Sequence, residues 1–79
     1  MSYKAAQKEF LAKNNIIIGS KVKVFQKAHH EQNDWPMYWT SEQDKCVGKK
    51  FKVHEIYDNG ILLDCKGEFW LFPYFVLSK

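Results

Sequence analysis

Hydrophobic and polar residues alternate along much of the chain after residue 20, and this pattern indicates β-strands with one buried face. The segment 21–25 alternates Val22 and Val24 with lysines, and the segment 49–57 alternates in the same way around Phe51. Both segments are predicted to be strands whose apolar side chains face a core and whose lysines face solvent.

Turn-forming residues divide the rest of this region into short strands. Asp58-Asn59-Gly60 predicts a tight hairpin with a type I′ turn, because Asn-Gly tolerates the positive φ angles of that turn. Pro73 ends the strand before it, since proline has no N–H to donate to a neighbouring strand. The remaining predicted elements are strands at 61–65 and 69–72, a turn at 66–68, and a helical turn with a last strand at 74–77.

Residues 2–13 are predicted to form an amphipathic helix that begins at Ser2 and ends in the left-handed region at Asn14-Asn15. Its apolar face consists of Tyr3, Ala6, Phe10 and Leu11. A helix this short is unstable alone, so this face must dock on something. We expect an N-terminal helical segment, 1–15, to pack on a β-domain formed by 16–79.

The strand pattern leaves a long connection, residues 26–48, between the first and second predicted strands. A connection of this length is either functional or disordered, and its aromatic content argues against disorder. A curled barrel suits five short strands, because closure removes exposed strand edges. The predicted fold class is therefore mainly β, a five-stranded antiparallel barrel with one short N-terminal α-helix.

Length and composition narrow the class of protein. A chain of 79 residues has a small core, and an aromatic content of 16% indicates that the packing of large rings compensates for this small size.

All 12 basic residues are lysines, and the net charge is +3. The lack of arginine argues against base-specific reading of nucleic acid but leaves non-specific phosphate contact open. Without a signal-peptide pattern or a membrane-spanning segment, we expect a cytoplasmic protein with no membrane partner and with Cys46 and Cys65 as free thiols.

Several motifs together carry a family resemblance over residues 19–78. They are a glycine-led first strand, a tryptophan-containing loop that leads into Val47-Gly48-Lys49, the "DNGILL" hairpin and an aromatic C-terminal segment. This combination resembles a group of small SH3-like barrel proteins, many of them encoded by bacteriophages. The chain differs from the group at two places. Gln43 stands where the group has a methionine before aspartate, and Phe69-Trp70-Leu71 stands where the group has two adjacent tryptophans. The matching residues are Trp39, Asp44, Val47, Gly48, Lys49, Trp70, Phe72, Pro73, Val76 and Leu77.

The resemblance implies an SH3-like barrel and, for a viral chain, a place in the host cytoplasm. It implies no particular activity, because members of the group are mostly of unknown function and a fold does not determine a function.

Two tryptophans and a tyrosine lie within five positions of the long connection. Either Trp35 or Trp39 is expected to plug an open end of the barrel, and Trp39, which matches the resemblance, is the favoured ring. The rest of the stretch Trp35, Pro36, Met37 and Tyr38 is expected to stay partly exposed as a recognition surface. The leading hypothesis is a non-enzymatic interaction module that binds a protein partner, a host protein if the chain is viral. The predicted partner-binding residues are Trp35, Met37, Tyr38, Trp39, Trp70, Phe72 and Tyr74.

Two alternative functions remain open. One is nucleic-acid binding, in which lysines contact phosphates and aromatic rings stack on bases. The other is a structural homodimer joined through the N-terminal helix. The lysines predicted for nucleic-acid binding are Lys21, Lys23, Lys49, Lys50 and Lys52.

The residue types that bind zinc are present, but their spacing is not that of a zinc site. The sequence contains neither a Cys-x-x-Cys pair nor two histidines separated by three to five residues. The residues considered are His29, His30, His54, Cys46 and Cys65. A nucleophilic cysteine with a histidine base would also need an oxyanion-stabilising group, which the flanking residues do not indicate. We therefore expect no catalytic residues, no metal site and no cofactor.

Overall fold

The computed structural model of the chain describes residues 2–29 and 32–79. Its helix α1 spans Tyr3–Asn14, and three short helical turns follow: η1 (Gln32–Asp34), α2 (Ser41–Asp44) and η2 (Tyr74–Val76). The strands are β1 (Lys21–Val24), β2 (Lys50–Tyr57), β3 (Gly60–Cys65), β4 (Glu68–Phe72) and β5 (Leu77–Ser78).

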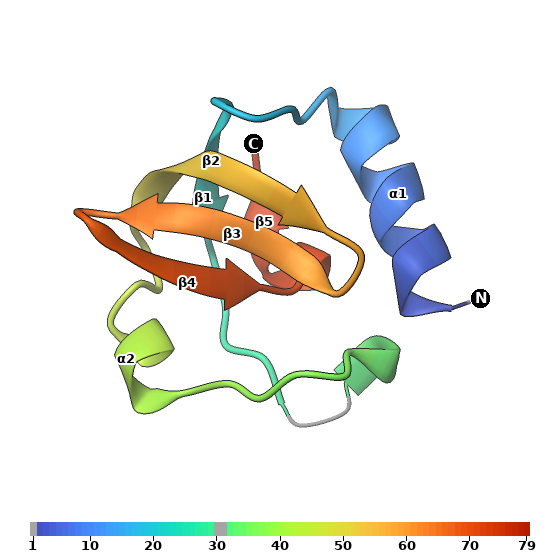
Figure 1. Cartoon of the computed structure of the whole chain (residues 1–79). Helices are drawn as coiled ribbons and strands as arrows, with labels where there is room; N and C mark the ends of the chain where they lie inside the picture. The colour runs from blue at the N-terminus through green and yellow to red at the C-terminus, as the bar shows by residue number, and fades with distance from the viewer. Residues whose placement is uncertain (1, 30–31) are drawn as a thin grey trace.

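The strands form one antiparallel sheet in the order β4-β3-β2-β1-β5 (Figure 1). Val22 of β1 lies opposite Phe51 of β2, so the two alternating segments pair as neighbours. The prediction of a mainly β chain with five antiparallel strands and one N-terminal helix is confirmed. α2 and η1 were not predicted; both lie in the long connection between β1 and β2.

The apolar residues of the strands fill one core. Val24, Ile61, Leu63 and Phe72 have no exposed surface, and Val22 and Val53 are almost as completely buried. Burial of each such side chain contributes roughly 1.5–3 kcal/mol relative to full exposure. The outward positions of β1 and the first two outward positions of β2 hold lysines, as the alternation predicts.

The first of the two hairpin turns differs in type from the prediction, whereas the second lies where a turn is predicted. β2 and β3 are joined by Asp58 and Asn59, and neither residue has a positive φ angle, so the predicted type I′ turn at this position is wrong. Gly60 is needed there for space, because a Cβ atom on it would lie 2.6 Å from Cγ of Leu71. The two-residue turn between β3 and β4 has positive φ at both Lys66 (57°) and Gly67 (92°), as a type I′ turn requires.

Helix α1 lies beside the β2–β3 turn (Figure 1). Ser2 caps its start by accepting from the Ala5 N–H, and Asn15 ends it with φ 54° and ψ 44°, as predicted. The Tyr3 hydroxyl donates to Gln7 Oε1 (2.7 Å) and accepts from the Tyr74 N–H (3.0 Å). Burial of this hydroxyl raises the pKa of Tyr3 above its usual value.

The connection between β1 and β2 places its first tryptophan inside the core. Trp35 is 1% exposed, and its indole N–H donates to the backbone oxygen of Asn59 (2.9 Å). Of the two tryptophans considered for the buried ring, Trp35 and not the favoured Trp39 is therefore the one inside the core. Left-handed backbone at Asn33 and Asp34 turns the chain just before Trp35, and the Asn59 carbonyl provides the acceptor that a buried indole requires.

Candidate functional site

Four outward lysines of β1 and β2 form two direct cross-strand pairs. Lys21 lies opposite Lys52, and Lys23 lies opposite Lys50. Opposite residues of antiparallel strands share a face of the sheet, with Cβ atoms about 4.5–5.5 Å apart. We call these four residues the lysine face; each of them is solvent-exposed.

This arrangement is unfavourable for folding, because like charges directly opposite each other repel and destabilise a strand pair. The ion pairs of the described residues use other lysines: Lys4 with Asp58, Lys27 with Asp44, and Lys45 with Glu42. Within residues 2–29 and 32–79, no carboxylate lies within ion-pairing distance of the lysine face. In this part of the chain, the four ammonium groups therefore have no ion-pair partner.

A shallow hollow of about 300 Å³ lies on this part of the surface. Asp64 lines it too and lies opposite Lys52 on β3, but its Oδ1 accepts from the backbone N–H of Gly67 (2.9 Å). Lys66, in the β3–β4 turn, adds a further cation to the hollow. The complete lining consists of Lys21, Lys50, Phe51, Lys52, Asp64, Lys66 and Gly67.

An exposed ring pair continues the same surface. Phe69 of β4 lies opposite Asp64, which lies opposite Lys52, so these residues form one row across three strands. Phe69 is 48% exposed, and its ring lies 4.4 Å from the His54 ring, centroid to centroid, at an interplanar angle of 34°. The outer face of the sheet therefore has a basic part on β1 and β2 and an aromatic part at His54 and Phe69.

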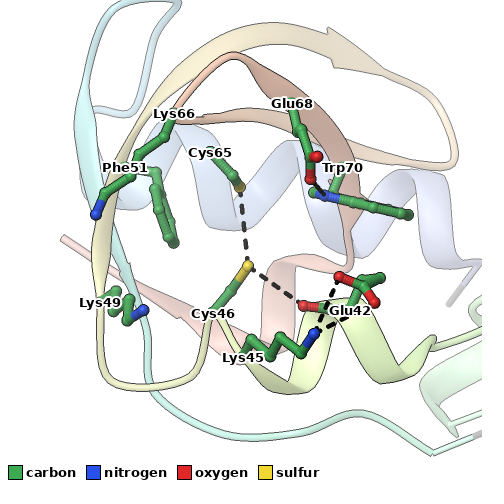
Figure 2. Close-up of a pocket in the computed structure, with 9 residues that line it drawn as sticks. All are labelled: Glu42, Lys45, Cys46, Lys49, Phe51, Cys65, Lys66, Glu68 and Trp70. Carbon is green, nitrogen blue, oxygen red and sulfur yellow. Dashed lines mark hydrogen bonds and ion pairs between the residues drawn. The ribbon is translucent and has the colours of Figure 1, made fainter.

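Lys49 differs from the other predicted nucleic-acid-binding lysines. It precedes β2 and has no cross-strand lysine partner, and its backbone oxygen accepts from the Val24 N–H (3.0 Å). Its side chain lines a separate hollow beside Cys46 (Figure 2).

The residues predicted to bind a protein partner do not form one exposed surface. Trp35 and Phe72 are buried, so their side chains are inside the fold and offer no surface to a partner. Trp39 is half-buried with its ring edge-on to Phe72 (5.7 Å between centroids), and its indole N–H donates to Asp44 Oδ1 (2.6 Å). Trp35, not Trp39, is thus the fully buried ring of the connection.

The other predicted partner-binding residues lie in three different places. Tyr74 packs under α1, with its ring 5.3 Å from Tyr3. Trp70 lines the hollow beside Cys46 and Cys65 (Figure 2). Met37 and Tyr38 remain exposed, at 36% and 69%, in the connection close to the β2–β3 turn, where the Asn59 side-chain amide contacts the Met37 sulfur (3.5 Å).

Cys46 and Cys65 are both buried, unpaired thiols, in agreement with the prediction of free cysteines. Their sulfur atoms lie 3.9 Å apart (Figure 2). The pKa of the Cys65 thiol is raised to about 12, mainly because the thiol is buried and secondly because Cys46 lies beside it. The candidate base His54 instead lies against Phe69 on the outer face of the sheet.

The described residues include no cluster of three or more histidine, cysteine or carboxylate side chains that could hold a metal ion. His29 is exposed, and His30, which was also considered as a ligand, lies outside the described residues. In the same part of the chain, no helix has the length and apolar character needed to cross a membrane.

Sequence reasoning missed three features of these surfaces. The His54–Phe69 pair and the proximity of Cys46 to Cys65 depend on strand register and on the fold of the connection, which no local pattern reveals. The lysines were identified from alternation, but their placement opposite one another follows only from the β1–β2 register.

Comparison of the chain with family models, with curated proteins and with solved structures finds no match.

Proposed function

We propose that the chain is a small SH3-like barrel that binds single-stranded nucleic acid non-specifically through the lysine face. A strand order with β1 between β2 and β5, together with the η2 turn between β4 and β5, supports this barrel class. The observation that carries the binding proposal is the cross-strand placement of like charges, with Lys21 opposite Lys52 and Lys23 opposite Lys50. A local arrangement that opposes folding is expected where function requires it.

The chemistry of the face fits a phosphate backbone. Lysines two residues apart on a strand recur about every 6.6 Å, and their long side chains adjust to successive phosphates. Lysine contributes point charges rather than the bidentate geometry with which arginine reads guanine, so binding is insensitive to sequence. The absence of arginine from the chain agrees with this mode.

The aromatic part of the same face supports single-stranded rather than duplex nucleic acid. Phe69, half exposed beside His54, offers a ring on which an unpaired base stacks. Stacking of a base on an aromatic side chain contributes about 1–3 kcal/mol, and it is available only where bases are not paired in a helix.

A salt titration tests the proposal. Anisotropy of a labelled oligothymidylate of about 12 nucleotides should give an affinity that falls with salt, with a log–log slope of about −2 to −3 for three or four phosphate contacts. The double variant Lys21→Gln/Lys52→Gln should reduce the magnitude of this slope by about 1.4. Lys8→Gln/Lys13→Gln, which removes the same charge from exposed positions of α1, is the matched control and should retain the slope. Equal effects of the two double variants would contradict a defined lysine face.

Phe69→Ala separates base stacking from charge. It should weaken oligothymidylate binding about 5- to 150-fold, the equivalent of one lost stacking contact. Binding of inorganic polyphosphate, which has the charge but no bases, should be unchanged. If the affinities for oligothymidylate and for polyphosphate fall equally, Phe69 acts through the fold of the face, and base stacking is not part of the function.

A protein partner is the second candidate function, and the exposure of Tyr38 and Met37 favours it. The surface is smaller than the sequence indicates, since Trp35 and Phe72 are buried. The helix face considered for a homodimer packs within the chain, where Tyr3 and Phe10 contact Tyr74.

A further inference from the structure

The side chains of Cys46 and Cys65 point toward each other from two separate parts of the chain (Figure 2). Cys46 follows α2 in the long connection, and Cys65 is the last residue of β3. Each sulfur also contacts a backbone oxygen at 3.8 Å, that of Glu42 for Cys46 and that of Leu63 for Cys65. The two sulfurs need to approach by roughly 2 Å to reach the bonding distance of a disulfide.

Both thiols line a hollow of about 140 Å³ at the surface, which gives small solutes access to them. A water molecule takes up about 30 Å³ in the liquid, so the hollow has room for an oxidant of the size of hydrogen peroxide. Lys45, Lys49 and Lys66 line the same hollow together with the carboxylates Glu42 and Glu68.

We propose that Cys46 and Cys65 are a redox modification site, which a peroxide converts from a dithiol into an intramolecular disulfide. In the first step the Cys46 thiolate attacks one oxygen of hydrogen peroxide, and the O–O bond breaks to give a sulfenic acid and hydroxide. In the second step the Cys65 sulfur attacks the sulfenic sulfur, the S–O bond breaks, and the Cys65 proton leaves with the departing hydroxide as water. The balance is two thiols and one peroxide to one disulfide and two waters.

The environment of the two thiols assigns these roles. The raised pKa of Cys65 keeps this thiol protonated at neutral pH, so Cys46 is the residue that meets the peroxide first. Cys65 then supplies the second sulfur from within contact distance. The proximity of 3.9 Å, and not the pKa, is what makes disulfide formation faster than further oxidation of Cys46.

A disulfide here would tie the end of α2 to the end of β3, two elements that no backbone pairing joins in the described residues. It closes a loop between positions 46 and 65, so the oxidised protein should melt roughly 10 °C higher than the reduced one. This inference is independent of nucleic-acid binding, because none of the four residues of the lysine face lines the hollow beside Cys46 and Cys65.

Intact-mass spectrometry of the reduced protein after treatment with hydrogen peroxide tests the site. The folded monomer should lose about 2 Da and both titratable thiols, with no increase in oligomers. The same treatment in denaturant is the control for proximity, and the disulfide should form at least 10-fold faster in the folded chain. Oxygen adducts on unlinked cysteines, disulfide-linked dimers, or equal rates in folded and denatured protein would each overturn the proposal.

The variant Cys65→Ser identifies the residue that is oxidised first. It should stop at adducts of about 16 Da or more on Cys46, because no second thiol is available. Cys46→Ser should react more slowly, since the remaining thiol is protonated. A circular dichroism spectrum and melting curve of each variant establish that it is folded, and Cys→Ala variants replace any that is not. Faster oxidation of Cys65 than of Cys46 would contradict the assigned roles.

Discussion

The β2–β4 meander and the connection between β1 and β2 are held in place by different kinds of contact. The meander is built from neighbouring strands joined by two-residue turns, with pairing that runs from Lys52 opposite Asp64 to Cys65 opposite Glu68. The described residues of the connection form the short turns η1 and α2 and no strand. The connection is held by side chains that bond to distant backbone.

Two of these side chains are buried and reach across the fold. The Trp35 indole donates to the Asn59 oxygen and the Gln43 amide donates to the Leu71 oxygen (2.6 Å), 24 and 28 residues away along the chain. Both acceptors belong to the meander. The meander is therefore shaped by pairing between neighbouring strands, whereas the connection takes its shape from a few long-range contacts with the meander. The consequences can be tested by removing those contacts one at a time.

The largest effect is expected from Trp35→Ala. Loss of a fully buried indole should cost about 3–5 kcal/mol of unfolding free energy, which is a large part of the stability of a domain of this size. Urea denaturation followed by circular dichroism measures it. Trp35→Phe keeps most of the apolar area and loses the bond to Asn59, so it should cost clearly less. If Trp35→Ala costs no more than Tyr38→Ala, the connection is not anchored through Trp35.

An intermediate effect is expected from Gln43→Ala. Gln43 is 2% exposed; its Nε2 donates to the Leu71 oxygen and its Oε1 accepts from the Thr40 N–H (2.9 Å), which completes a capping box for α2. The variant leaves these backbone groups unpaired and should cost about 2–3 kcal/mol. Its neighbour Glu42 is exposed, so Glu42→Ala is the control and should change stability by about 0.5 kcal/mol or less. Equal costs would show that the tether to Leu71 contributes nothing.

The smallest of the three effects is expected within the meander, from Gly60→Ala. The added Cβ would meet Leu71 Cγ at 2.6 Å, so the substitution should cost about 1–3 kcal/mol by overpacking. In the background of Leu71→Ala, which removes the obstructing atoms, the same substitution should cost much less. A double-mutant cycle measures this coupling. Independent effects of the two substitutions would mean that backbone conformation, and not space, requires glycine at this position.

The regions also differ in how far the sequence predicts them. Alternation around Phe51 and the turn residues at 58–60 and 66–68 predict the strands of the meander to within one residue, because these signals are local. The capped helix α1 is predicted for the same reason. Local signals do not say that Trp35 is buried instead of exposed, because its partner Asn59 lies in another hairpin.

The candidate site shows the same limit. Alternation identifies Lys21, Lys23, Lys50 and Lys52 as outward residues, but a shift of one residue in the β1–β2 register would change which lysines lie opposite each other. Phe69 was not predicted as a site residue because its position beside His54 depends on the register of β3 with β4 and on the irregularity in β2 between Val53 and Glu55. Residue types are thus visible in the sequence, whereas their grouping into a surface is not.

The most direct test of binding by the lysine face is a residue-resolved NMR titration of the ¹⁵N-labelled protein with oligothymidylate. Binding by the lysine face predicts that the largest amide shift changes fall on residues 21–23, 50–54 and 69, and that the amides of Met37 and Tyr38 change little. Shift changes concentrated at Met37 and Tyr38, or absent at saturating oligonucleotide in low salt, would contradict it.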